Sequence, residues 1–320
     1  MGLNEKFFKT SAADDTPNFG VVTYSGNGSS QNIDTLGFAP DWIWIKNRND
    51  TNGHAFFDSV RGAGKLLVPN ATAVETGNSG DLLGSFRPLG FQVNRNYVGS
   101  TANDTTNGLS NLTYVGWAWK AGGAAVQNND GTIQGANCLV SANQDAGFSI
   151  TKYTGNGISG ATFGHGLGQQ VGLSIVKNVG SSTYWYVYSN LLPTNNNLYL
   201  NTSDSKQADG VMLGGNSTTV SISASSAVNT NNGSYIAYNF ASVNGYQKIG
   251  TYQGDNSTNE SNIINVGFQP SFVMIKNTTS GSTSWVIADD ERGYADLYAN
   301  DASAEFASGS LYGAHFTSVG

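Results

Sequence analysis

Short apolar runs alternate with polar gaps rich in Gly, Asn, Ser and Thr along the whole chain. In the run at residues 42–46, the side chains of Trp42 and Trp44 point to one face of an extended strand and those of Ile43 and Ile45 to the other. A strand that is apolar on both faces is typical of the centre of a β-sandwich. No run of helical periodicity reaches three turns, so the pattern predicts an all-β protein.

One phrase, a Tyr followed two residues later by Gly and then Asn or Asp, is written three times, and each copy leads to an apolar run ending in Lys-Asn. The phrases lie at residues 24–27, 153–156 and 252–255, and the Lys-Asn pairs at 46–47, 177–178 and 276–277. The period of roughly a hundred residues is the length of a small domain. We therefore predict tandem antiparallel β-sandwich repeats of the jelly-roll or lectin-like kind, preceded by a short N-terminal arm.

The repeat pattern predicts four segments. Residues 1–18 form the arm, residues 19–125 the first repeat, residues 126–242 a linker hairpin with the second repeat, and residues 243–320 the third. Phe7 and Phe8 supply an apolar anchor in the arm, which is typical of a docking peptide that attaches a protein to a larger assembly.

The first two repeats close with an aromatic strand, at residues 113–119 and 234–240. Residues 316–320 line up with residues 86–90, so the third repeat reaches the end of the given sequence before its closing strand. A sandwich without that strand exposes a sheet edge. We expect the sequence to be part of a longer chain; the alternative is a strand supplied from elsewhere.

Composition excludes several classes of protein. The net charge is -7, and the 15 Lys and Arg residues are scattered singly, so nucleic-acid binding is not expected. No apolar stretch has the length of a membrane span or a signal peptide, which predicts a protein assembled in the cytoplasm without membrane insertion. Cys138 is the only cysteine, so we expect no intrachain disulfide and a buried thiol.

An Asp-x-x-Arg-Gly pattern occurs twice, beginning at Asp58 and at Asp289. The structural interpretation is an ion-paired turn in which Gly takes a positive φ; the functional one is a set of polar groups presented to a sugar, with Asp58, Asp289 and Glu291 as acids for glycoside hydrolysis. Pairing of these acids with Arg61 or Arg292 would argue against the hydrolase. The acidic run 289–291 lacks EF-hand spacing, so no cofactor is expected, with Ca²⁺ as the alternative.

The remaining candidates are histidines and aromatics. His54, His165 and His315 lie far apart without metal-ligand spacing, which favours structural roles and no metal site. Most tryptophans are expected in cores. Tyr184, Tyr186 and Tyr188 alternate along one strand and form the candidate exposed surface, either for glycan binding or for an interface between subunits.

Several phrases together resemble a β-rich repeat family of tailed-bacteriophage virion surface proteins, of the tail-fibre and capsid-decoration type. The resemblance is carried by residues 4–8, 24–28, 37–41, 44–48, 58–62, 117–123, 147–150 and 164–168. It covers nearly the whole chain, and it implies a virion structural protein with lectin-like sandwiches and no catalytic residues.

The resulting expectation is a tail fibre or appendage protein on the virion surface, not an enzyme, assembled as a homo-oligomer, with a trimer favoured. It would bind other virion proteins through its arm and contribute to recognition of host-surface glycans. The alternatives are a capsid decoration or cement protein, a glycan depolymerase and a secreted lectin.

Overall fold

The computed structural model describes residues 17–77, 82–98, 101–109, 111–254, 263–293 and 295–306. Within these residues the fold is all-β, with several antiparallel sheets and one short helix, α1 (Ser226–Asn229). The predicted fold class is confirmed at this level. Among the same residues, no helix is long and apolar enough to cross a membrane.

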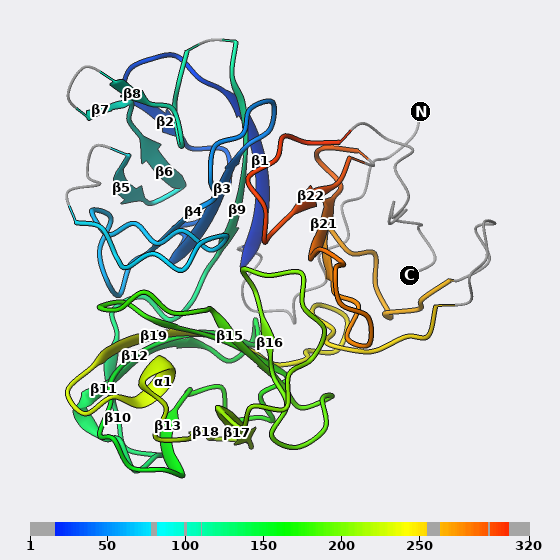
Figure 1. Cartoon of the computed structure of the whole chain (residues 1–320). Helices are drawn as coiled ribbons and strands as arrows, with labels where there is room; N and C mark the ends of the chain where they lie inside the picture. The colour runs from blue at the N-terminus through cyan, green and yellow to red at the C-terminus, as the bar shows by residue number, and fades with distance from the viewer. Residues whose placement is uncertain are drawn as a thin grey trace.

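The first sheet has the order β1-β9-β3-β4 and lies in the blue and cyan part of Figure 1. Its strands are β1 (Phe19–Ser25), β9 (Thr113–Trp119), β3 (Trp42–Asn47) and β4 (Ala55–Asp58). Strand β3 is buried along its whole length between β9 and β4, as its two apolar faces predict. A small sheet of β2 (Gln31–Ile33), β6 (Gly90–Val93) and β5 (Leu83–Arg87) shares one apolar cluster with it. A hairpin of β7 (Asn96–Val98) and β8 (Thr101–Asn103) completes this part.

The second sheet has the order β10-β11-β12-β19-β14-β15-β16. Its strands are β10 (Val126–Asn128), β11 (Gly135–Asn143), β12 (Phe148–Thr154), β19 (Ser234–Phe240), β14 (Leu173–Asn178), β15 (Tyr186–Ser189) and β16 (Leu198–Tyr199). A sheet of β13 (Ala161–Gly164), β18 (Thr219–Ile222) and β17 (Met212–Gly215) packs on it through a second apolar cluster that includes Cys138. The expected linker hairpin turns at residues 129–133 and joins β10 to β11, and Cys138 is fully buried, as predicted.

The third sheet contains β20 (Phe272–Ile275), β21 (Val286–Asp289) and β22 (Leu297–Tyr298) in that order. The order β12-β19-β14-β15 of the second sheet matches β1-β9-β3-β4 of the first. In the third sheet, β20 and β21 take the places of β3 and β4. In both hairpins the first strand leads into a Lys-Asn pair, residues 46–47 or 276–277, and the second strand comes after it.

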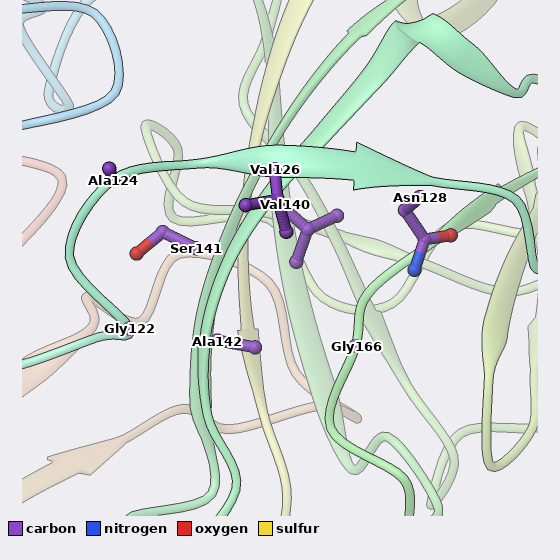
Figure 2. A pocket seen from close by; sticks show the side chains of 8 residues that line it. All are labelled: Gly122, Ala124, Val126, Asn128, Val140, Ser141, Ala142 and Gly166. Carbon is purple, nitrogen blue, oxygen red and sulfur yellow. The ribbon is translucent and has the colours of Figure 1, made fainter.

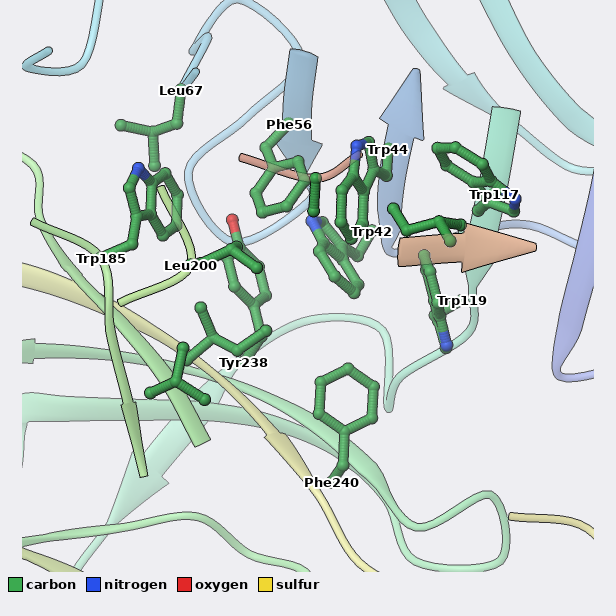
Figure 3. Packing of buried hydrophobic residues seen from close by; sticks show 14 of the residues in the cluster. Trp42, Trp44, Phe56, Leu67, Trp117, Trp119, Trp185, Leu200, Tyr238 and Phe240 are labelled. Atoms are coloured by element: carbon green, nitrogen blue, oxygen red, sulfur yellow. The ribbon is translucent and has the colours of Figure 1, made fainter. Parts of the chain in front are cut away.

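A central cluster joins all three sheets, and Figure 3 shows its side chains converging from strands of different sheets. The Trp42 ring stacks on Trp119 of its own sheet at 4.3 Å and on Tyr238 of the second sheet at 4.5 Å between ring centroids. The six tryptophans of the chain are all buried, none more than 6% exposed, so the expectation of core tryptophans is confirmed. Because aromatic rings remove large apolar areas from water, the burial of this cluster stabilises the packing of the three sheets.

Several expectations from the sequence are not tested by these observations. The arm residues Phe7 and Phe8, His315 and the segment 316–320 lie outside the described residues. The domain boundaries at residues 18, 125 and 242 stay predictions.

Candidate functional site

The first Asp-x-x-Arg-Gly segment forms a buried ion-paired turn at the end of β4. The Asp58 carboxylate accepts hydrogen bonds from the Arg61 backbone N at 2.8 Å and from Arg61 Nε at 2.6 Å. Their side chains are 0% and 3% exposed, and Gly62 has a φ of 101°, which a residue with a Cβ adopts only with strain. Arg61 Nη1 continues to the Glu75 carboxylate at 3.0 Å.

The second such segment repeats this geometry at the end of β21. Asp289 accepts from the Arg292 backbone N at 2.9 Å and from Arg292 Nε at 2.6 Å, and Arg292 Nη1 lies 3.2 Å from the Glu305 carboxylate. Gly293 has a φ of 72°. The structural interpretation of the pattern, an ion-paired turn with a positive-φ glycine, is confirmed at both places.

Both carboxylates also accept a hydrogen bond from another sheet. The Tyr238 hydroxyl on β19 donates to Asp58 Oδ2 at 2.8 Å, and Trp117 Nε1 on β9 donates to Asp289 Oδ2 at 2.8 Å. Tyr238 and Trp117 hold matching positions, because each pairs with the third residue of its neighbouring strand, Ile175 in β14 or Trp44 in β3. Each ion-paired turn is therefore a polar joint between two sheets.

A second set of joints uses the residue just before β4, β15 and β21. His54 Nε2 lies 3.0 Å from the Tyr298 carbonyl, Trp185 Nε1 donates to the Val68 carbonyl at 3.2 Å, and Trp285 Nε1 donates to the Tyr199 carbonyl at 2.8 Å. Through these hydrogen bonds, the first sheet binds the third, the second binds the loop that follows β4 of the first, and the third binds the second. The three sheets form a closed ring.

The His54 ring has a defined protonation state in this arrangement. Trp44 Nε1 donates to His54 Nδ1 at 2.7 Å, so Nδ1 is the acceptor and Nε2 carries the proton that is donated to Tyr298. Burial lowers the pKa of His54 to about 3, with the nearby Lys46 charge adding to the shift. His54 is a neutral structural histidine.

Backbone hydrogen bonds connect the same three parts of the chain with the direction of donation reversed: the first part donates to the second, the second to the third and the third to the first. Glu75 N donates to the Val179 carbonyl at 2.9 Å, and Lys206 N donates to the Thr278 carbonyl at 3.1 Å. Glu305 N donates to the Arg48 carbonyl at 2.6 Å, and the Arg48 guanidinium also binds the Glu305 carboxylate through two bonds of 2.8 Å. Each acceptor is the residue directly after a Lys-Asn pair.

The lysines of those pairs are buried or half-buried and bind backbone carbonyls. Lys46 Nζ donates to the carbonyls of Asn47 and Asp50, and Lys177 Nζ to those of Asn178 and Ser181. Burial lowers the pKa of Lys46, Lys177 and Lys276 to about 8 in each case. These ammonium groups hold loops in place.

The expected tyrosine surface is only partly exposed. Tyr186 and Tyr188 are each 8% exposed and belong to the cluster under the sheet of β13, β18 and β17, so the expectation of an exposed ladder is wrong for these two. That sheet covers the face of β15 to which they point. Tyr184 is 44% exposed and stacks on Tyr199 at 4.6 Å between ring centroids.

A shallow cavity of about 240 Å³ lies beside β10 and β11. Figure 2 shows that small and apolar side chains line most of it, with Asn128 and Ser141 as its polar members. Ser141 Oγ is buried without a hydrogen-bond partner in the described part of the chain. The lining has no acid, base or aromatic ring, which leaves it without groups for catalysis or for sugar stacking.

The candidate acids and bases are not assembled into a catalytic centre in the described part of the chain. Asp58 and Asp289 are held by Arg61 and Arg292, the arrangement that argues against a hydrolase, and Glu291 lies exposed next to the second turn. His165 is buried, accepts from the Leu167 backbone N at 3.2 Å, and its pKa is lowered by burial. No group of three or more His, Cys, Asp or Glu residues suited to a metal ion occurs among the residues that the structure describes.

The sequence did not indicate the joints made by Trp117, Tyr238 and His54. Aligning the two closing strands places Trp117 and Tyr238 at the same position, but nothing in the sequence names the carboxylate that each side chain reaches.

Comparison with known proteins gives one match. A family model described as "Domain of unknown function (DUF7483)" matches residues 14–320. Nothing among curated proteins or solved structures matches the chain.

Proposed function

Because the chain belongs to the DUF7483 family, whose description names no activity, we propose its function from its geometry and from the resemblance of its phrases to phage proteins. The proposal is a structural protein of a tailed-bacteriophage particle, displayed on the particle surface as part of a tail fibre or appendage. Its three units are tandem copies of one sandwich, and it acts by binding and holding rather than by catalysis.

The observation that carries this proposal is that the side chains best suited to acid–base chemistry form contacts between sheets. Asp58, Asp289 and His54 would be the natural acids and bases of an enzyme, yet each one joins two sheets through a hydrogen bond that is buried or, for His54, partly buried. A chain that places its buried charges in joints is suited to mechanical cohesion, because breaking a buried pair leaves an uncompensated charge. The phrases that carry the resemblance, residues 44–48 and 58–62, lie in these joints.

Contact with host-surface glycans is proposed at Tyr184. This ring is exposed and braced by Tyr199, whose hydroxyl donates to Asp209 at 2.6 Å. An exposed aromatic ring that is held in place by a second ring is a suitable surface for stacking a sugar. Multivalent display would raise a weak affinity of this kind.

The test of the proposal is to locate the chain on purified particles of the virus that encodes it. Antibodies raised against the protein are applied to intact particles and visualised by immunogold electron microscopy, with mass spectrometry of the same particles. Label on the tail supports the proposal, and label over the head assigns a capsid decoration protein instead. Absence of the chain from purified particles would overturn the virion assignment.

Glycan contact needs a separate measurement. Purified protein is titrated onto host cells and onto extracted surface polysaccharide, with the variants Tyr184→Ala and Val126→Ala compared. Both positions are exposed, so the second variant controls for loss of surface area. Loss of binding by Tyr184→Ala alone supports the glycan site, and equal binding by both variants argues against it.

A further inference from the structure

The third sheet presents a strand edge where the other two sheets are paired. Strand β3 pairs with β4 on one side and β9 on the other, and β14 pairs with β15 and β19. Strand β20 pairs with β21, and this is its single strand neighbour among the described residues. Its four residues are all half-buried, whereas β3 is buried throughout.

The segment that precedes β20 also lacks the strand pairing found in the other two sheets. Residues 19–25 and 148–154 form β1 and β12, each paired with a closing strand, β9 or β19. The matching residues 247–253 belong to no strand. Tyr252 is 49% exposed, while its counterparts Tyr24 and Tyr153 stack on closing-strand tyrosines at 5.1 and 4.9 Å between ring centroids.

We propose that the edge of β20 and the segment 248–252 accept an added antiparallel β-strand with the residue pattern of β9 and β19. That pattern is Tyr, apolar, small, aromatic, any residue, aromatic. The occupant is an extended polypeptide segment of this pattern, inserted between the two elements as β9 lies between β1 and β3.

The register of the added strand follows from the two complete sheets. Their closing tyrosines pair with Asn47 and Asn178, and their middle aromatics, Trp117 and Tyr238, pair with Trp44 and Ile175. The matching residues of the third sheet are Asn277 and Met274. The added strand therefore places its tyrosine opposite Asn277 and beside Tyr252, and its middle aromatic opposite Met274.

The side-chain environment at that position is mostly apolar and carries no charge. Trp117 and Tyr238 each donate a hydrogen bond to an aspartate of a neighbouring sheet. For the middle aromatic of the added strand, the corresponding position in the second sheet is occupied by Ser189. Leu192 stands where the other two sheets have the arginine of the ion-paired turn. Leu192, Ile249 and Met274 are half-buried and pack against the central cluster. An inserted aromatic ring would cover them and complete the ring of joints, a conclusion that does not depend on the proposed virion role.

The probe is a synthetic peptide with the sequence of residues 113–119 and flanking lysines for solubility. The control peptide has the same composition with the two tryptophans shifted by one position, which sends them to the opposite face of the strand. Binding to the full chain is followed by fluorescence anisotropy, and hydrogen exchange with mass spectrometry locates the site.

Support for the proposal is saturable binding about tenfold tighter than that of the control peptide, with amide exchange slowed at least about tenfold in residues 248–252 and 272–277. The variant Met274→Glu is expected to abolish binding, while Val126→Glu on the edge strand β10 leaves it unchanged.

Three outcomes would overturn the proposal. Amides of β20 that exchange as slowly as those of β3 before peptide is added would mean that the edge is already covered. Protection that grows with protein concentration alone would make a second copy of the chain the occupant. Protection at residues 126–128 instead would place the peptide on β10.

Discussion

The Tyr238 hydroxyl donates a hydrogen bond to Asp58 Oδ2 at 2.8 Å, joining the closing strand of the second sheet to a carboxylate of the first. The two residues are 180 positions apart in the chain. Asp58 already forms a buried ion pair with Arg61, so the tyrosine supplies a third hydrogen bond to a charge that is removed from water. Tyr238 also stacks on Trp42, so its ring and its hydroxyl both bind across the same interface.

Removing this hydroxyl should destabilise the protein without changing the packing of the ring. Tyr238→Phe is expected to lower the free energy of unfolding by about 1.5–3 kcal/mol, the usual range for a hydrogen bond to a charged group. Tyr184→Phe, on an exposed ring, is the matched control and should stay within about 0.5 kcal/mol of the parent protein. Urea denaturation measures both, and similar midpoints for the two variants would contradict a structural role for the joint.

The ion pair of the third sheet should behave as a unit. Asp289→Ser leaves the Arg292 guanidinium buried beside the Trp117 ring, with its nearest carboxylate removed, and is expected to cost about 3–5 kcal/mol. The double variant Asp289→Ser with Arg292→Leu introduces the residues found at positions 189 and 192 of the second sheet. It should be more stable than the single variant by at least about 1 kcal/mol, because it removes the buried guanidinium, which in the single variant keeps only its longer pair with Glu305.

A double-mutant cycle with Arg292→Leu alone completes this experiment. Glu305 keeps its pair with Arg48 in every variant, so the cycle isolates the coupling between Asp289 and Arg292. Additive effects of the two substitutions would contradict the interpretation of the pair as a buried joint.

The turns at Asp58 and Asp289 were predictable because all of their central partners lie within four residues, where sequence spacing fixes geometry. The buried tryptophans were predictable from their place in strands that are apolar on both faces. The burial of Tyr186 and Tyr188 was not, because their cover comes from β17 and β18, whose pairing the local pattern does not define. The bond from Trp117 to Asp289 spans 172 residues, and no local rule specifies such a contact.

His54 predicts a loss of stability in mild acid. Its folded-state pKa of about 3 lies below the ordinary value of 6.5, so the unfolded chain binds a proton that the folded chain excludes. Its contribution to stability is complete above pH 6.5 and is lost as the pH falls toward 3, by up to about 1.4 kcal/mol per pH unit. Urea midpoints between pH 7 and about 4.5, where most carboxylates stay ionised, should therefore fall more steeply in the parent protein than in His54→Gln. Parallel profiles would contradict a neutral, buried His54.

The buried lysines predict a rise in stability in mild alkali. The pKa of Lys177 is lowered to about 8 by burial, so between pH 8 and its unfolded value near 10.5 the unfolded chain binds more protons than the folded one. The free energy of unfolding should then increase with pH by up to about 1.4 kcal/mol per unit for each such lysine, and Lys46 and Lys276 share the shift. Burial also raises the pKa of the Cys138 thiol to about 11, which acts in the opposite direction from about pH 9 upward. Burial raises the pKa of tyrosines such as Tyr153 as well, and this acts in the opposite direction only near pH 10 and above.

Lys177→Met should remove about one third of the lysine contribution to this slope, because three lysines carry similar shifts. Lys152→Met, at an exposed position of β12, is the control and should keep the full slope. The measurement is a series of urea midpoints from pH 7 to 9.5 for the parent protein and both variants. A slope that is unchanged by Lys177→Met would mean that its ammonium group is solvated in the folded protein, and that the carbonyls of Asn178 and Ser181 are held by other contacts.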